Sequence, residues 1–378
     1  MGSSIRSYID AIINPHTEWR TLRGIEPLCD EAGRLVYSVG NSAVVFKVRY
    51  EGRLCKLRCY IRPKHSLRAI YRERFFGAEL RIFDYMGKSE WADVVLEDWC
   101  DGETLQHHIE HAVGDSAEML RLAKLFERFA LWLLGENWAH GDLKPDNMVI
   151  TTEGELRLID FDAIVSPRLE GLACEELGAL KYQHPQRGLM QCKAIDDYPI
   201  ALIATALHAM AADVTLVERY SIQDMILVDP QDAVAGRDVA LEEIERLFAH
   251  RGDAVHYRMA RLLRSQSVAL PELGELLSYS IAEPLENDSP LELDCKAGHW
   301  GYRTGSQWIV PPLYDEGFEF SEGVAAVRLC DVWHFIDLRG RVCFSCEGCE
   351  RIKPFRNGRA IKVVAGKRIE IDHSGREL

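Results

Sequence analysis

The spacing of apolar residues changes several times along the first hundred positions. Residues 3–13 place apolar side chains every three or four positions, which predicts an amphipathic helix. From 34 to 62, β-branched and aromatic runs alternate with short Gly-containing breaks, which predicts an antiparallel meander. Residues 65–76 favour one helix, and 78–85 and 91–99 favour two more strands. This part of the chain therefore predicts a small sheet with helices beside it.

Longer helical patterns fill the middle of the chain. Most of 104–282 has helical spacing, and 117–135 is its clearest amphipathic segment. The apolar run 198–217 approaches the length of a membrane span, but it contains His208 and Asp213. A buried helix is the favoured interpretation, and we expect no membrane segment.

The C-terminal part, from about 293, changes to short strands and repeats itself. The repeat has a period of 35 residues, so that Gly305, Gly340 and Gly375 occupy equivalent positions, as do Ala325 and Ala360. A repeat of this length is typical of a modular unit that buries its core by stacking against its neighbours.

Composition narrows the classes of partner and compartment. The chain has 378 residues, 45 Lys and Arg against 59 Asp and Glu, and a net charge of −14, so a nucleic-acid backbone would be repelled. The 11 cysteines occur without a signal-peptide pattern, which favours a reducing, cytoplasmic location over a disulfide framework. The length predicts more than one core.

One segment, residues 139–150 (AHGDLKPDNMVI), gathers polar side chains between a helix and a strand. Phosphoryl transfer needs a carboxylate to orient a hydroxyl, a cation near the γ-phosphate and oxygen ligands for Mg²⁺. Asp142 is the candidate base, Lys144 the candidate phosphate contact, and Asn147 and Asp160 the candidate metal ligands.

This segment resembles the catalytic loop of eukaryotic-type protein kinases, H-R-D-x-K-x-x-N, and "LIDFD" (158–162) resembles their D-F-G motif. The resemblance implies ATP and Mg²⁺ as cofactors, Ser or Thr of a protein as acceptor, and a bilobal α+β fold with a β-rich N-lobe and a helical C-lobe. It places Arg58 where these kinases have the ATP-binding lysine. Glu73 is the candidate ion-pair partner of Arg58, with Glu79 second.

The phosphate-binding loop that the resemblance implies is poor in glycine. Its three glycine positions align with Ser38, Gly40 and Ala43. Gly141 replaces the arginine of H-R-D, and Asp162 stands at the glycine of D-F-G, where it either stiffens the turn or adds a carboxylate near the metal.

Two charged residues are expected at the back of the nucleotide site. Lys56 precedes Arg58 by two residues, so on a strand both side chains point to the same face and Lys56 can substitute as phosphate contact. Glu97 aligns with the gatekeeper position. Because a buried carboxylate needs a cation, we hypothesise a Lys56–Glu97 or an Arg58–Glu97 pair.

The repeats have a resemblance of their own. Residues 300–315 and 333–342 resemble WG repeats, and the whole chain resembles bacterial proteins that join a kinase-like domain to such repeats. WG repeats would serve as an interaction module for a protein partner. The expected organisation is an N-terminal helix and lead-in (1–29), an N-lobe (30–103), a C-lobe (104–285) and a WG-repeat β domain (286–378).

Two functions remain open at this point. The first is an ATP- and Mg²⁺-dependent protein kinase, and a related interpretation keeps the nucleotide chemistry but changes the transferred group or the acceptor. The second is a pseudokinase scaffold that binds partners without turnover, favoured by Arg58, Asp162 and the glycine-poor loop. Separately, Cys343, Cys346 and Cys349 have CxxCxxC spacing; packing is favoured over a metal site because they occupy ordinary repeat positions.

Overall fold

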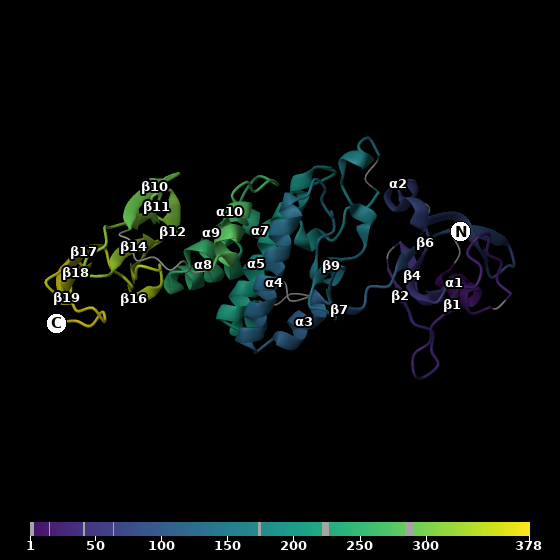
Figure 1. Cartoon of the computed structure of the whole chain (residues 1–378), viewed down its shortest axis with the longest axis horizontal. Helices are drawn as coiled ribbons and strands as arrows, with labels where there is room; N and C mark the ends of the chain where they lie inside the picture. The colour runs from purple at the N-terminus through teal and green to yellow at the C-terminus, as the bar shows by residue number, and fades with distance from the viewer. Residues whose placement is uncertain are drawn as a thin grey trace. The chain divides into compact units, whose positions relative to one another are not determined.

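The computed structural model describes residues 4–14, 16–40, 42–62, 64–172, 175–220, 227–283 and 291–378. It is a mixed α+β chain with antiparallel sheets (Figure 1). The chain divides into two compact units. Unit 1 comprises Met1–Glu103, His140–Asp142 and Val149–Gly178, and unit 2 comprises Thr104–Ala139, Leu143–Met148 and Ala179–Leu378.

Unit 1 is built on a six-stranded sheet with the strand order β1-β3-β4-β6-β5, and β2 pairs with β3. The predicted N-terminal helix is present as α1, whose first turn is capped by the Ser4 side chain, and the predicted meander is present as β2 to β4. The elements are α1 (Ile5–Ile13), β1 (Glu26–Pro27), β2 (Tyr37–Val39), β3 (Ala43–Tyr50), β4 (Arg53–Tyr60), β5 (Phe75–Phe83) and β6 (Ser89–Asp98).

The helix expected over 65–76 is much shorter in the structure. It consists of α2 (Leu67–Tyr71) and the 3₁₀ turn η1 (Arg72–Arg74), and β5 begins at Phe75. The α-helix ends because its C-cap residue Arg72 adopts φ 51° and ψ −115°, outside the α-helical region. Phe75 and Phe76 then pair with Val95 and Val94 of β6, as their aromatic rings favour.

The remaining short strands of this part form a three-stranded sheet in the order β7-β8-β9. Its strands are β7 (Gly102–Thr104), β8 (Met148–Thr151) and β9 (Leu156–Leu158). This sheet is connected to the two motif segments. The polar segment 139–150 continues into β8, which begins at Met148, and β9 leads directly into residues 159–162.

The middle of the chain is helical, as its periodicity predicts. The helices are α3 (Leu105–Ala112), α4 (Ser116–Gly135), α5 (Asp197–Ala212), α6 (Thr215–Tyr220), α7 (Pro230–Val234), α8 (Val239–Arg251), α9 (Ala254–Leu262) and α10 (Leu273–Ile281). The apolar run that begins at 198 is α5, and its residues 198–210 are buried. No helix in the described ranges combines the length and apolarity that crossing a bilayer requires.

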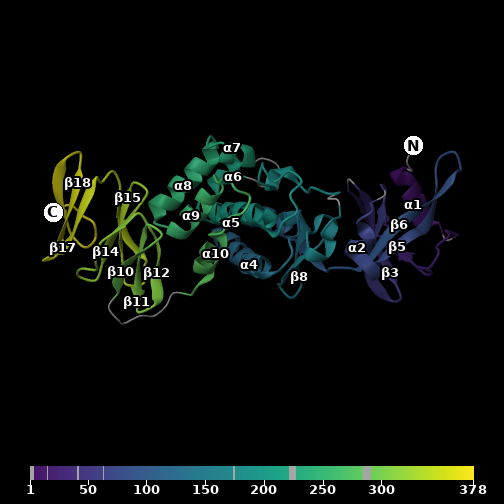
Figure 2. The ribbon, with the colours of Figure 1, turned by 90° about the horizontal axis from the view of Figure 1, so that it is seen from above.

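The C-terminal residues 291–378 form three antiparallel meanders (Figure 2). Their sheets have the orders β10-β11-β12, β13-β14-β15-β16 and β17-β18-β19. The strands are β10 (Glu292–Lys296), β11 (His299–Thr304), β12 (Gln307–Tyr314), β13 (Glu316–Gly317), β14 (Ala325–Leu329), β15 (Val332–Ile336), β16 (Val342–Cys346), β17 (Arg351–Arg356), β18 (Arg359–Val364) and β19 (Lys367–Ile371).

The structural period of these meanders agrees with the sequence period. A shift of 35 residues carries β15 (Val332–Ile336) onto β19 (Lys367–Ile371) residue by residue. The equivalent glycines Gly305, Gly340 and Gly375 all have positive φ, between 59° and 78°. At Gly375 a Cβ atom would also lie 2.7 Å from the Phe344 ring, so this copy needs glycine for space as well as for conformation, whereas at Gly305 the conformation alone favours it.

Candidate functional site

Arg58 is the centre of a buried ionic cluster in unit 1. It lies on β4, its side chain is 4% exposed, and it forms ion pairs with Asp160 and Asp162. The distance from Arg58 Nη1 to Asp162 Oδ1 is 2.8 Å, and Nη2 contacts Asp160. The strand residue and the two acids lie about a hundred positions apart in the sequence, and the fold brings them together.

Asp162 accepts hydrogen bonds from four side chains, which the sequence did not indicate. Besides Arg58, they are Tyr71 (2.5 Å), Tyr60 (2.9 Å) and Lys64 (3.0 Å). Its side chain is 8% exposed, and both of its carboxylate oxygens accept hydrogen bonds, Oδ1 from Arg58 and the two tyrosines and Oδ2 from Lys64. Asp162 therefore anchors this cluster and is not placed to serve as a third metal ligand. Tyr60 could have been anticipated as a partner, because it lies two residues after Arg58 on β4 and its side chain therefore points to the same face of the sheet.

Asp160 is more accessible than Asp162, with 38% of its side chain exposed. Desolvation alone would raise the pKa of Asp160, but the Arg58 guanidinium outweighs it and lowers this pKa. Asp160 therefore stays ionised, and Arg58 engages Oδ1. Its donor chemistry suits a Mg²⁺ ligand, since carboxylate oxygens are what this cation prefers.

His140 joins the segment of Asp142 to the segment of Asp160. Its Nε2 donates to the carbonyl of Ile159 (3.0 Å), and its Nδ1 accepts from the backbone N–H of Asp142 (3.3 Å). The imidazole also packs against Phe161, with ring centroids 5.3 Å apart. A buried His140 thus braces the candidate base Asp142 against the chain that carries Asp160.

Gly141, which stands where the resembling kinases have arginine, cannot be replaced without a clash. It has φ +80°, and a Cβ atom here would lie 2.1 Å from the carbonyl oxygen of Ala163. The close approach of the two segments therefore requires glycine at this position. The sequence showed the departure from the motif but not its steric cause.

Lys144 and Asn147 belong to unit 2. Lys144 has an extended backbone and precedes η2 (Pro145–Asn147), and Asn147 is buried at the end of that 3₁₀ turn. Pro145 begins the turn, which its fixed φ favours. The two residues are thus held by a short, well-defined turn.

Glu73 and Glu79, the predicted partners of Arg58, are not its ion-pair partners in the structure; Asp160 and Asp162 are. Glu73 is exposed on η1. Glu79 is 2% exposed and accepts hydrogen bonds from the backbone of Thr21 and Leu22, both at 2.7 Å. The shortening of the predicted 65–76 helix explains this, because Glu73 does not lie on a helix that faces the β4 strand.

Glu97 and Lys56 are paired across the β4–β6 ladder, directly opposite one another. The Glu97 side chain is 12% exposed, and its ion pair is with Arg74, at 3.8 Å. Desolvation and the nearby Arg58 lower the pKa of Lys56, whereas Glu97 raises it. Glu97 is thus half-buried beside cations, although the closest one is Arg74.

The strands β2 and β3 contain or flank the residues aligned with the glycine-rich loop. Gly40 donates its N–H to the carbonyl of Ala43 at 2.9 Å, and Ala43 is 5% exposed at the start of β3. Ser38 pairs with Val45 between these strands.

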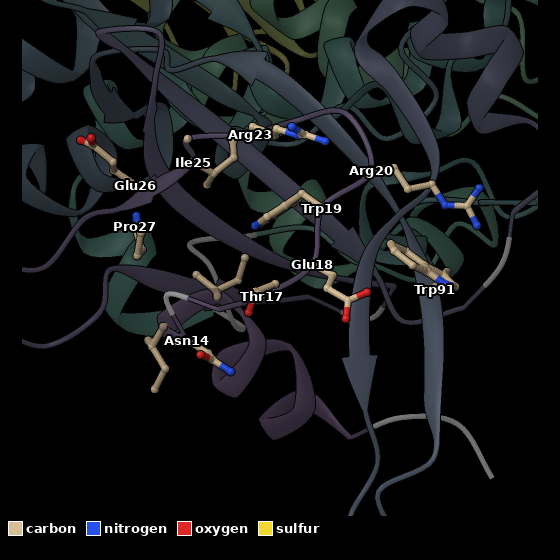
Figure 3. Close-up of a pocket in the computed structure, with 13 residues that line it drawn as sticks. Asn14, Thr17, Glu18, Trp19, Arg20, Arg23, Ile25, Glu26, Pro27 and Trp91 are labelled. Atoms are coloured by element: carbon tan, nitrogen blue, oxygen red, sulfur yellow. The ribbon is translucent and has the colours of Figure 1, made fainter.

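Unit 1 also has a hollow at the N-terminal lead-in, and none of its lining residues belongs to the Arg58 cluster. It has a volume of about 760 Å³ and is lined by α1, by residues 17–27 and by Trp91 (Figure 3). The Arg20 guanidinium lies over the Trp91 ring at 4.6 Å. Glu18 pairs with Arg81 at 2.7 Å, so the walls of this hollow are tied to the main sheet.

Two of the three CxxCxxC cysteines belong to the repeat core. Cys346 and Cys349 pack with Trp333 and Phe355, and burial raises the pKa of Cys346 to about 11. Cys343 is exposed. Among the described residues, one group of His, Cys, Asp or Glu side chains lies close enough to share a metal ion. These cysteines are not part of it.

Residues 304–333 match the family model of the WG containing repeat. The matched segment runs from the end of β11 into β15, so it begins in one meander and ends in the next. The C-terminal region therefore contains WG repeat sequence, as predicted.

Proposed function

We propose that the chain is a kinase-like phosphotransferase that uses ATP and Mg²⁺ and acts on Ser or Thr of a protein. The observation that carries the proposal is the bridge made by His140, which holds the Asp142 segment against the Asp160 segment while Arg58 pairs with Asp160. A bilobal kinase-like fold is part of the proposal. The six-stranded sheet of unit 1 and the succession of helices α3 to α10 support it.

Each proposed role follows from the chemistry of its side chain. Asp142 orients and deprotonates the acceptor hydroxyl, and Lys144 neutralises charge on the γ-phosphate. Asp160 and Asn147 would hold Mg²⁺, which when bound neutralises the charge that develops on the phosphates. Arg58, with Lys56 beside it, contacts the α- and β-phosphates, and Gly40 and Ala43 border them.

Arg58 has to divide its donors between protein and nucleotide. Its Nη1 is fixed by Asp162 and Tyr71, whereas its Nη2 contacts the more exposed Asp160. Because each terminal nitrogen of a guanidinium carries two N–H donors, Arg58 can keep the Asp162 contact through Nη1 and offer an Nη2 N–H to a phosphate.

The segment after Asp160 is held by carboxylates rather than by a phosphorylatable residue. Glu175 accepts hydrogen bonds from the backbone N–H groups of His65 (3.0 Å) and Ser66 (2.9 Å), and Glu176 pairs with Lys64 at 2.6 Å. This supports an enzyme whose activity does not wait for phosphorylation of that segment.

The second candidate function is a pseudokinase scaffold, and the same cluster favours it. Arg58 already neutralises Asp160, so the charge of this carboxylate is balanced without a metal ion. In that case the WG repeats and the kinase-like part bind partners without turnover.

The test measures transfer of radiolabelled γ-phosphate from ATP to the chain itself and to a generic basic protein, with and without Mg²⁺. We expect Mg²⁺-dependent transfer that falls at least 100-fold in Asp142→Asn and in Asp160→Asn. The matched control is Asp146→Asn, an exposed aspartate of the same loop, which should keep its activity.

Absence of transfer, together with no Mg²⁺-dependent rise in melting temperature on adding ATP, would select the scaffold. Equal transfer by the wild type and Asp142→Asn would contradict the assignment of the base.

A further inference from the structure

Three helices of unit 2 direct titratable side chains into one buried point, and none of these residues belongs to the phosphotransfer motifs. Glu127 on α4 is 0% exposed, and His208 on α5 and His256 on α9 are each 6% exposed. One ligand atom from each lies within 4.8 Å of the others. Among the described residues, this is the one group of side chains that lie close enough together to share a metal ion.

Two of the three distances between the ligand atoms agree with tetrahedral coordination, and the third pair lies within 4.8 Å. Glu127 Oε1 lies 3.1 Å from His208 Nε2 and 3.3 Å from His256 Nε2. Ligands at zinc bond lengths of about 2.0–2.1 Å on a tetrahedron are about 3.3 Å apart. An ion can therefore be accommodated with little movement of the three helices.

His256 is oriented in the way that metal-bound histidines are. Its Nδ1 lies 2.7 Å from Asp253 Oδ2, and a metal-ligating imidazole usually donates its other N–H to a carboxylate. That bond leaves a lone pair on Nε2 in the neutral ring, directed at the Glu127 oxygen. Without a metal ion the ring can instead carry a second proton and donate Nε2–H to Glu127 Oε1, 3.3 Å away, so a metal ion would replace a proton at this point.

His208 supplies a second reason to expect a cation. Its Nε2 is buried and has no aligned hydrogen bond, although it lies 3.1 Å from Glu127 Oε1. A buried ring nitrogen without a hydrogen bond is costly, and coordination would satisfy it.

The neighbouring groups complete a coordination shell. Ser280 Oγ, just before the end of α10, lies 3.0 Å from His256 Nε2 and 2.8 Å from Glu127 Oε2. Lys124 lies 3.3 Å from Oε2, so it neutralises the outer oxygen and leaves Oε1 for the imidazoles. The two imidazole rings are stacked at 3.5 Å, so one of them must turn about its Cβ–Cγ bond for both lone pairs to converge.

We propose that Glu127, His208 and His256 form a structural site for a divalent cation of the zinc class, with Ser280 Oγ or a water as fourth ligand. Two nitrogen ligands and one carboxylate suit Zn²⁺ or Co²⁺ better than Mg²⁺ or Ca²⁺. The ion would join α4, α5 and α9. This proposal is independent of phosphotransfer.

The experiment uses the full chain, stripped with a chelator and then titrated with Co²⁺ and with Zn²⁺. We expect one tightly bound equivalent of Zn²⁺ by elemental analysis, and the intense visible absorption of tetrahedral Co²⁺. Binding should weaken at least 100-fold in His208→Asn and Glu127→Gln, and 10- to 100-fold in Asp253→Asn, which removes only the orienting carboxylate.

The matched control removes a surface alternative. His107 and His111 lie one turn apart on α3 with ring centroids 4.0 Å apart, a spacing that captures metals adventitiously. His111→Asn should keep the full equivalent and the cobalt spectrum. Loss of binding in His111→Asn alone would overturn the proposal.

A wild-type chain that shows no tetrahedral cobalt spectrum and no bound zinc would also overturn it, and the cluster would then be held by a shared proton. Because this readout is made on the wild type, it does not depend on the folding of any variant.

Discussion

At the scale of single residues, two positions are explained by the contacts that the fold creates around them. Gly141 is required because the chain segments of Asp142 and Ala163 meet at van der Waals distance. Asp162 is required because four donors converge on it. Both residues depart from the motif that they otherwise resemble, and both departures have a steric or electrostatic cause.

Gly141→Ala should lower the free energy of unfolding of unit 1 by about 3 kcal/mol or more, because backbone strain at positive φ adds to a clash with a carbonyl oxygen. Gly154→Ala is the matched control, since Gly154 has φ +83° and open space around its Cβ position. It should cost about 1 kcal/mol. Urea denaturation measures both, and equal losses would contradict the steric account.

Asp197 predicts a pH dependence of stability. Burial raises the pKa of Asp197 from 3.8 to about 6, although Leu270 donates its N–H to this carboxylate at 2.9 Å. Because the folded-state pKa lies above the unfolded one, the stability from this group is complete below about pH 4 and is lost as pH rises through about 6.

Asp197→Asn keeps an acceptor for Leu270 and cannot ionise. It should therefore be more stable than the wild type at pH 8, by about 1–3 kcal/mol, and equal to it at pH 4. Urea midpoints at the two pH values test this. A gain of the same size at pH 4 would show that the effect is not ionic.

At the scale of elements, the second and third C-terminal meanders share one core. Trp333 on β15 is 3% exposed and packs with Phe318, Phe335 and Phe355, which come from both meanders. The repeats therefore stabilise each other through their neighbours, as stacked repeats do.

Trp333→Ala should remove about 3–5 kcal/mol of stability, because it deletes a buried ring and leaves a cavity. The control is Trp132→Ala on α4, where the ring is 51% exposed, and its cost should stay below about 1 kcal/mol. Chemical denaturation followed by circular dichroism compares them. A Trp333→Ala cost as small as the control would refute the shared core.

At the scale of the whole molecule, the first meander belongs to the same compact unit as the helices. Arg258 on α9 donates to the carbonyl of Leu313 (3.0 Å) and to Asp315 (2.6 Å). Gly252, at the end of α8, lies close to Val342 and His334 of the second meander. The repeats are thus attached to the helical part by directed contacts and not by the chain alone.

Arg258→Ala should weaken this attachment by about 2 kcal/mol, since it leaves a partly buried carboxylate and a carbonyl without their donor. Hydrogen exchange of the β12 amides should accelerate by about ten-fold or more, while α4 and α5 stay protected. Glu347→Gln, which alters the exposed His250–Glu347 pair, is the control and should change exchange little. Unchanged protection of β12 in Arg258→Ala would contradict the directed attachment.

Local patterns in the sequence were sufficient to predict α1, the β2–β4 meander, the helical succession and the period of the repeats. These features depend on residues a few positions apart, or on exact repetition, and both can be read along the chain. The aspartates and the arginine of the candidate site could also be named, because motif spacing identifies them.

Their partners could not be named in the same way. Asp162 meets Tyr60, Tyr71 and Lys64 across about a hundred residues, and Glu127 meets His208 and His256 from three helices. The expected 65–76 helix was wrong in its length because pairing of Phe75 and Phe76 with β6 outweighed helical spacing. Contacts of this kind depend on how elements pack, and periodicity within one element contains no information about what another element brings against it.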